Sequence, residues 1–203
     1  MRSRSHAVDP YAGIQAATRE HQRSHGCGAY TYQDGALPGV IAAAVGASRI
    51  VEVGTALGYT ACWLAAATPT TTVDTIEFDP DHVHLARTQI SSAGLSGRVT
   101  VHLGDADEVL TSLLRGAYDV AFFDGFTPTT TTITHLRACL RDGGVLLAAN
   151  LTLGPARDVL RELHNPALWT THSFGETAIC VKTEHVEAGG RSAPPTPPPP
   201  RRT

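Results

Sequence analysis

The sequence lacks two features that mark whole classes of protein, a long apolar run and an excess of basic residues. Among its 203 residues, Lys and Arg number 16 and Asp and Glu number 19, which gives a formal net charge of −3. Because no apolar run is long enough to cross a bilayer or to form a signal peptide, we expect no membrane partner. The slightly negative charge offers no electrostatic footprint for a polyanion, so we expect no nucleic-acid partner.

Cysteines are also few, and none forms a Cys-x-x-Cys pair. Three of the four lie inside apolar patterns, which predicts buried thiols. Scattered, unpaired thiols are typical of a reducing compartment, so we expect a cytoplasmic protein. The four residues are Cys27, Cys62, Cys139 and Cys180.

What the sequence does contain is a regular alternation of strand and helix patterns. Its length and its 42% hydrophobic content suit one domain with a full core. The alternation predicts an α/β, Rossmann-like fold, with a seven-stranded, mostly parallel sheet, an antiparallel last strand and helices on both faces. Helices are expected over residues 9–24, 36–45, 61–67, 81–92, 106–114, 128–140 and 155–164, and strands over 50–53, 72–77, 98–102, 118–124, 144–148, 169–173 and 178–182.

Two terminal segments flank the α/β domain of residues 29–183. In the N-terminal helical segment, residues 1–28, Asp9 can cap a helix whose face with Tyr11 and Ile14 could support a homodimer or pack on the chain's own sheet. The Pro-rich tail, residues 184–203, is expected to be disordered. A polyproline tail can dock in an aromatic groove, but a solubilising end also explains it.

A short strand, a glycine turn and a helix follow one another directly between residues 50 and 67. The strand Ile50–Val53 is apolar apart from Glu52, and Gly54 and Gly58 stand between it and an alanine-rich helix. Glycine lets a backbone turn tightly out of a sheet and approach a ligand, which the N–H groups of the new helix then face. The segment therefore predicts a nucleotide-binding turn.

The spacing of the glycines limits the class of ligand that the turn can bind. A dinucleotide site needs Gly-x-Gly-x-x-Gly, whereas Thr55 and Ala56 stand where the second glycine would clear room for pyrophosphate. The next strand ends at Glu77, where a carboxylate can accept hydrogen bonds from both ribose hydroxyls. A ribose without a diphosphate fits S-adenosylmethionine. The alternative is an ordinary glycine turn and a surface glutamate.

Two further acids follow strands of the same sheet. Asp105 can cap the next helix, and an acid here could also reach an adenine amino group. Asp124 ends a strand at the edge where open α/β sheets bind ligands. Asp124 could instead cap the following helix, but Thr127 before Pro128 is the better cap.

These motifs resemble class I S-adenosylmethionine-dependent methyltransferases of the catechol and caffeoyl-CoA O-methyltransferase type. The resemblance runs from about residue 30 to residue 182, which makes residues 29–183 the methyltransferase domain. It rests on Glu52-x-Gly54-x-x-x-Gly58-Tyr59-Thr60, Thr75-Ile76-Glu77-Phe78-Asp79-Pro80, Gly104-Asp105-Ala106 and Tyr118-Asp119-Val120-Ala121-Phe122-Phe123-Asp124.

The resemblance implies a role for each motif. Gly54 would lie against the cofactor and Glu52 beneath the turn, near the cofactor amino group. Tyr59 and Thr60 would lie near the methionine carboxylate, and Glu77 would hold the ribose. The residues Asp105 to Asp107 would border the adenine. The expected cofactor-binding residues are Glu52, Gly54, Gly58, Tyr59, Thr60, Glu77, Asp105, Ala106 and Asp124.

The chain departs from this family where metal-dependent members hold Mg²⁺. Those members follow the fifth strand with an Asp-Asn pair, but here the pair is Ala149-Asn150, and the lysine that serves them as a base after the equivalent of Asp124 is missing. A hard divalent ion depends on carboxylate charge, so the affinity for Mg²⁺ should fall sharply. We therefore expect methyl transfer without a metal and assign no metal ligands.

Asp124 is the expected catalytic residue, because a carboxylate at this edge can orient or deprotonate an acceptor. Histidines are the rival bases, but none has a distinctive spacing. His82 and His84 lie two apart on a helix and point to different faces, which argues against a metal pair. The rivals in the acceptor half are His135, His164 and His172.

Three functional hypotheses remain open. The first is O-methylation of a small-molecule acceptor. The second is a cofactor-binding protein or partner subunit without catalysis, suggested by the missing lysine and carboxylate. The third is an NAD-dependent oxidoreductase, which the residues Thr55 and Ala56 in the turn disfavour.

Overall fold

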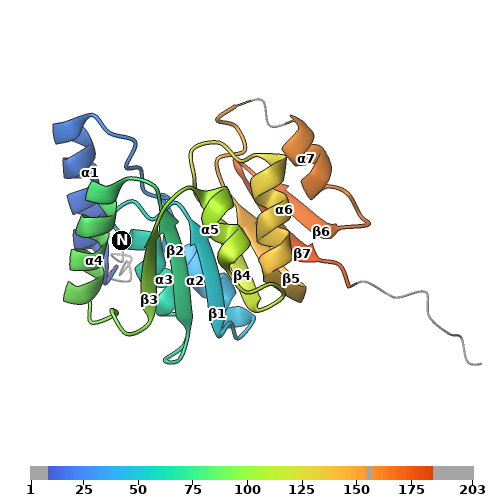
Figure 1. Ribbon diagram of the computed structural model, residues 1–203, viewed down its shortest axis with the longest axis horizontal. Coiled ribbons are helices and arrows are strands. Elements are labelled where there is room, and N and C mark those ends of the chain that lie inside the picture. The colour runs from blue at the N-terminus through green and yellow to red at the C-terminus, as the bar shows by residue number, and fades with distance from the viewer. Residues whose placement is uncertain (1–8, 155–156, 185–203) are drawn as a thin grey trace, which may run out of the picture.

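A computed structural model of the chain describes residues 9–154 and 157–184 and shows one mixed sheet of seven strands (Figure 1). The strand order is β3-β2-β1-β4-β5-β7-β6. Residues 1–8 of the N-terminal segment and 185–203 of the Pro-rich tail lie outside the described residues. The strands are β1 (Arg49–Val53), β2 (Thr72–Glu77), β3 (Val99–Leu103), β4 (Tyr118–Phe123), β5 (Leu140–Ala148), β6 (Trp169–Phe174) and β7 (Thr177–Lys182).

The pairing of the strands confirms the predicted sheet. The first five strands pair in parallel, and β7 pairs antiparallel with both β5 and β6. The chain places β2 and β3 on one side of β1 and β4 and β5 on the other, so the strand order reverses between β1 and β4. Such a reversal opens a crevice at the carboxyl ends of the two strands, which is where open α/β sheets bind ligands.

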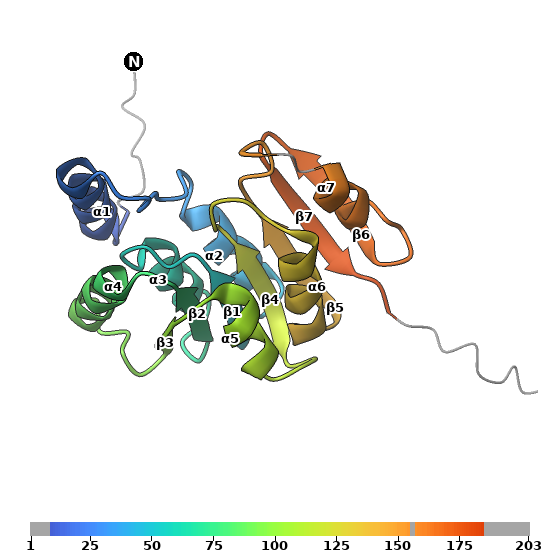
Figure 2. The same cartoon turned by 45° about the horizontal axis from the view of Figure 1, so that its top comes forward.

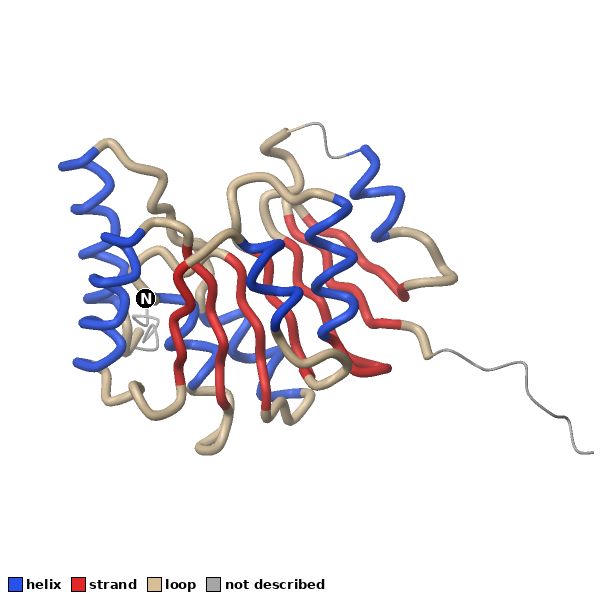
Figure 3. Tube along the Cα trace, viewed as in Figure 1, coloured by secondary structure: helices blue, strands red, loops and turns tan. Residues whose placement is uncertain are grey.

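Helices cover both faces of the sheet, as Figures 2 and 3 show. The side chains of β1 alternate between the two cores, because Ile50 packs with the first four helices and Val51 with the last three. No helix in residues 9–154 and 157–184 combines the length and the apolar character that a membrane crossing requires. The helices are α1 (Ala12–His25), α2 (Ala36–Ala44), α3 (Tyr59–Ala65), α4 (Pro80–Ser92), α5 (Ala106–Ser112), α6 (Thr130–Cys139) and α7 (Arg157–Leu163).

The cap of α6 differs from the sequence prediction. Thr129, not Thr127, caps the helix, because the Thr129 hydroxyl accepts a hydrogen bond from the Thr132 N–H at 3.0 Å. Pro128 is buried one residue before this cap, so the helix begins two residues later than predicted. The cap is therefore the threonine that directly precedes the helix, because its hydroxyl can accept an otherwise unpaired N–H of the first turn, and not the threonine before the proline.

The N-terminal helix also begins later than predicted. Asp9 does not cap α1 itself: its carboxylate accepts the Tyr11 N–H at 2.8 Å and forms a turn before the helix, which starts at Ala12. The Tyr11 ring packs edge-on against Trp63 at 5.5 Å, and Ile14 is buried in the core. The face with Tyr11 and Ile14 therefore packs on the chain's own core.

Candidate functional site

The acids and the glycine turn that the sequence singles out converge at the carboxyl edge of the parallel strands. Gly54 follows β1, Glu77 ends β2, Asp105 follows β3 and Asp124 follows β4. The parallel register aligns these strand ends, because Val53 pairs with Ile76 on one side and with Phe123 on the other. The site lies at the reversal of strand order between β1 and β4.

The glycine turn is backed directly by the segment that carries Asp124. Gly54 has φ +95°, and a Cβ added to it would lie 2.6 Å from the backbone carbonyl oxygen of Asp124. Gly58 has φ +93°, and a Cβ there would press on Ile90 of α4 at 3.0 Å. Both positions need glycine for conformation and for space. At Gly54, the turn lies against the Asp124 backbone.

Glu52 lies fully buried beneath the turn, as the resemblance implied. Thr60 and Thr75 each donate a hydroxyl hydrogen bond to its carboxylate, Thr75 at 2.6 Å, and the hydroxyl of Thr55 lies 2.6 Å from that of Thr75. Burial raises the pKa of Glu52 from 4.5 to about 7, against the lowering effect of the two threonine hydroxyls. This carboxyl group is therefore poised to change its charge near neutral pH.

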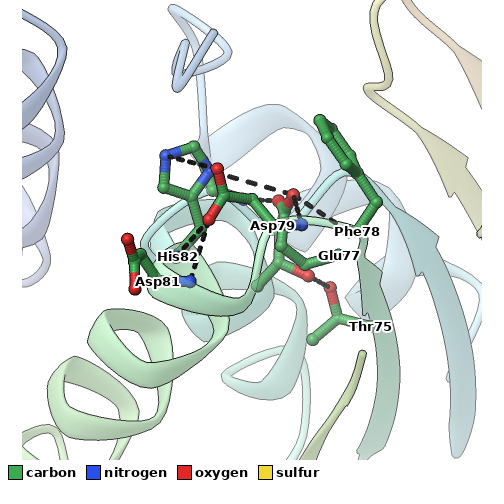
Figure 4. Close-up of polar contacts among 8 residues, drawn as sticks. Thr75, Glu77, Phe78, Asp79, Asp81 and His82 are labelled. Carbon is green, nitrogen blue, oxygen red and sulfur yellow. Dashed lines mark hydrogen bonds and ion pairs between the residues drawn. The ribbon is translucent and has the colours of Figure 1, made fainter. Parts of the chain in front are cut away.

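Glu77 connects the end of β2 with the glycine turn. One carboxylate oxygen accepts the Ala56 N–H at 2.9 Å, and the other accepts the N–H groups of Phe78 and Asp79 at 3.0 and 3.1 Å (Figure 4). A carboxylate offers about four acceptor positions, so three are already used here. Both ribose hydroxyls could bind Glu77 only if one of these N–H contacts is exchanged for the ligand.

Two apolar side chains stand exposed beside the strand ends. Phe78, next to Glu77, is 77% exposed, and Leu103, before Asp105, is 52% exposed. Asp105 caps α5 as predicted, since its carboxylate accepts the N–H groups of Asp107 and Glu108 at 2.9 and 3.3 Å. Ala106 begins that helix and is half-buried. The edge between β2 and β3 thus presents apolar surface suited to a flat ring.

Asp124 lies at the other side of the turn in a partly enclosed setting. The Asn150 side-chain amide donates to its Oδ1 at 3.3 Å and to the carbonyl of Gly125 at 2.7 Å. Burial, with the nearby negative charge of Glu52, raises the pKa of Asp124 well above 3.8. Ala149 is fully buried and supplies a methyl group where the metal-dependent pattern has a carboxylate. Asp124 is thus paired with one neutral amide.

Tyr59 and Thr60 begin α3 and point in different directions. Thr60 is directed at Glu52, whereas the Tyr59 hydroxyl donates to Asp9 at 2.7 Å. Burial, with the Asp9 carboxylate as acceptor, raises the pKa of Tyr59 to about 12. A hollow of about 260 Å³ opens beside the Tyr59 ring. Its lining is Asp9, Gln33, Asp34, Gly35, Ala36, Tyr59 and Trp63.

The rival histidine bases have other contacts. His135 lies 3.4 Å from the carboxylate of Asp107, and the ring of His164 lies 3.0 Å from the hydroxyl of Ser173. The ring of His172 is exposed and stacks on Phe174. These contacts join α6 to α5, the residue after α7 to β6, and two residues within β6, so each of the three rings is engaged away from Asp124.

Sequence reasoning missed the site contacts of three side chains, although Thr75 stands in one of the motifs and Asp9 was expected to cap a helix. Thr75 connects Glu52 with Thr55, and Asp9 holds the hydroxyl of Tyr59. Tyr32 packs edge-on against Phe122 of β4 at 5.5 Å, and its own pKa is raised by burial. Thr75 could have been found from its position two residues before Glu77, on the same face as Glu52 once the strands are aligned. No spacing signal marks Asp9 or Tyr32.

Comparisons with known proteins find methyltransferases. A family model described as a methyltransferase domain matches residues 51–151. A protein of Mycolicibacterium smegmatis named "Putative O-methyltransferase" is 36% identical over 145 residues, which cover 70% of this chain and 69% of that protein. A catechol O-methyltransferase of Mycobacterium tuberculosis is 37% identical over 97 residues, 47% of this chain and 44% of that protein. The chain spans about two thirds of the length, or less, of the curated relatives it matches.

A solved structure shares the fold. The crystal structure of the O-methyltransferase TomG from Streptomyces achromogenes, in complex with SAM, superposes with a TM-score of 0.77 at 23% identity. The superposition covers 88% of this chain and 92% of that one. Because identity at this level shows the fold alone, the similarity supports the arrangement of the strands and helices rather than the chemistry.

Proposed function

This chain belongs to the O-methyltransferase family, and from that membership we propose that it transfers a methyl group from S-adenosylmethionine to a hydroxyl group of a small-molecule acceptor. The observation that carries the proposal is the close approach of Gly54 to the Asp124 backbone, where an added Cβ would lie 2.6 Å from the carbonyl oxygen, because it brings the glycine turn next to the acid assigned as the base. Family membership also agrees with the resemblance drawn from the motifs of the sequence.

The cofactor fits the edge of the sheet between β1 and β3. Glu77 can accept one ribose hydroxyl as it stands and both once the Ala56 N–H contact is exchanged, and the exposed ring of Phe78 can cover an adenine. The positive charge of the cofactor ammonium group would favour the ionised form of Glu52 beneath the turn. A dinucleotide is less suited, because Thr55 and Ala56 occupy the room that a pyrophosphate needs.

The chemistry assigned to Asp124 is proton acceptance. The acceptor oxygen attacks the methyl carbon, the carbon–sulfur bond breaks, and sulfur keeps the electron pair as S-adenosylhomocysteine forms. The hydroxyl proton passes to the Asp124 carboxylate. Burial raises the pKa of Asp124 well above 3.8, which makes its carboxylate a stronger base than a solvated aspartate. Alignment and exclusion of water lower the rest of the barrier.

The residues around Asp124 do not fit a Mg²⁺ site. Mg²⁺ needs oxygen ligands with carboxylate charge, whereas the groups here are one carboxylate, the Asn150 side-chain amide, whose nitrogen faces Asp124, and the methyl group of Ala149. We therefore derive no step through a metal at Asp124.

The cellular compartment, the acceptor class and the role of the N-terminal helix are inferred from the thiols, the net charge and the packing of that helix. Three of the four free thiols are buried, which supports a reducing, cytoplasmic environment. The acceptor is proposed to be a small molecule because the net charge of −3 offers no footprint for a polyanion. Tyr11 and Ile14 pack inward, so this proposal needs no homodimer through that face.

The test is the formation of S-adenosylhomocysteine from S-adenosylmethionine with a panel of phenolic acceptors, for the wild-type chain and for Asp124→Asn. We expect turnover to fall at least about 100-fold in Asp124→Asn while cofactor affinity stays within a few-fold, because general-base loss affects the chemical step. The matched control is Asp142→Asn, since Asp142 is exposed at the start of β5, near Lys182. Cofactor binding without any product from the wild-type chain would instead support the non-catalytic alternative.

A further inference from the structure

Three side chains from separate segments converge beside the proposed cofactor site. His21 lies on α1, Cys27 follows its C-terminal cap at Gly26, and His82 lies in the first turn of α4. Their potential ligand atoms all lie within 4.8 Å of one another. His82 is 5% exposed, and the other two side chains are half-buried. An imidazole, a thiol and a second imidazole thus meet in one partly enclosed space.

The three side chains make few other polar contacts. Among the hydrogen bonds of residues 9–154 and 157–184, none involves the ring nitrogens of His21 or His82 or the thiol of Cys27. The ring of His21 meets that of His82 edge-on at 5.2 Å. The nearest carboxylate oxygens to the His82 ring, on Glu77 and Asp79, lie 3.8 and 3.9 Å away, beyond hydrogen-bond distance. The ligand atoms of the three side chains are therefore available to one another and to an ion between them.

We propose that His21, Cys27 and His82 bind one zinc-class divalent metal ion, a site separate from the magnesium pattern at Asp124. A thiolate with two imidazoles suits Zn²⁺ or Co²⁺ and disfavours Mg²⁺, which needs oxygen ligands. Tetrahedral ligands at about 2.0–2.3 Å from Zn²⁺ lie about 3.3–3.7 Å from one another, so side-chain movements of about 1 Å complete the set.

A fourth ligand is at hand. Asp79 caps α4 through its Oδ1, while its Oδ2 lies 3.9 Å from Nε2 of His82. In Figure 4, the ring of His82 lies beside the Asp79 carboxylate, and a dashed line joins it to Glu77, whose Oε1 is 3.8 Å from Nδ1 of His82. A carboxylate beside a ligating histidine is the usual partner that fixes the orientation of its ring. Asp79 or a water molecule can occupy the fourth position.

The proposed metal would attach α1 to the cofactor edge. Only Ile14 and Thr18 of the 14 residues of α1 are buried, so packing alone holds this helix weakly. The metal would connect its C-terminal end to α4, directly behind Glu77. The site therefore has a structural role, and its binding does not depend on methyl transfer.

The test is titration of the chelator-stripped full chain with Co²⁺, followed by its thiolate-to-metal charge-transfer absorption and visible bands. We expect one Co²⁺ per chain with tetrahedral bands, displaced by Zn²⁺. Cys27→Ser should abolish the charge-transfer band, and His21→Gln should weaken binding about 100-fold or more. The matched control is His84→Gln, because His84 is exposed on the same helix and should bind as the wild type does.

A second measurement distinguishes the loss of metal binding from misfolding of a variant. Zn²⁺ should raise the Tm of the wild-type chain and of His84→Gln but not that of Cys27→Ser, provided that circular dichroism shows all three folded. The proposal is overturned if the wild-type chain gives no charge-transfer band, or if Cys27→Ser and His21→Gln bind Co²⁺ as tightly as the wild type.

Discussion

Replacing Glu52 by glutamine should change the stability of the protein in a way that depends on pH. The unfolded carboxyl group has a pKa of 4.5, and burial raises the folded pKa to about 7. Below pH 4.5 the group is neutral in both states and contributes no difference. Between the two values the unfolded state ionises first, so stability falls as pH rises, and above about pH 7 the full penalty remains. At about 1.4 kcal/mol for each pKa unit, that penalty is about 3 kcal/mol.

Glutamine is neutral at every pH, so Glu52→Gln escapes this penalty. The free energy of unfolding of the variant, relative to wild type, should therefore rise by about 3 kcal/mol between pH 4.5 and pH 8.5. Urea denaturation followed by tryptophan fluorescence at several pH values measures it. The exposed residue Glu108 supplies the control variant Glu108→Gln, for which the difference should stay nearly flat. If the difference in free energy of unfolding between Glu52→Gln and wild type did not change with pH, the raised pKa of the buried Glu52 would be refuted.

Three other outcomes are expected. Asp119 is half-buried, and this desolvation raises its pKa, but the Arg141 guanidinium and backbone N–H donors outweigh desolvation and lower the pKa to about 2. Asp119→Asn should therefore cost about 2 kcal/mol at pH 7, and urea titrations should show this cost disappearing as pH falls from about 4 to 2. Gly54→Ala should cost at least about 2 kcal/mol and abolish cofactor binding by calorimetry, because its Cβ would meet the Asp124 carbonyl. Glu77→Ala should weaken S-adenosylmethionine binding at least about tenfold, and unchanged affinity would exclude Glu77 as the ribose acceptor.

The sequence predicts the sheet and the ends of its strands well, for a physical reason. Short, mostly apolar runs followed closely by Gly54, Glu77, Asp105 and Asp124 mark both the strands and their carboxyl edge, and parallel pairing then brings those ends together. Local chemistry is enough to identify each of these positions. The cap at Asp105 follows from the same local rule.

Contacts between distant segments could not be predicted in this way. The hydrogen bond from Tyr59 to Asp9 joins residues 50 positions apart, and no local sequence pattern around either residue predicts it. The failure at Thr127 is different, because two neighbouring threonines both satisfy the cap rule and only the backbone after Pro128 decides between them. His82 shows a third case: its separation from His84 predicts that the two rings face different sides of the helix, but it cannot reveal that His21 on α1 and Cys27 after that helix lie close to His82.

The most direct test of the central claim is calorimetric titration of the chain with S-adenosylmethionine, repeated with Mg²⁺ added and with NAD in place of the cofactor. The account predicts one site per chain with micromolar affinity, unchanged by Mg²⁺, and no heat from NAD. The absence of S-adenosylmethionine binding in every condition, or binding of NAD instead, would contradict the assignment of the glycine turn and of the function built on it.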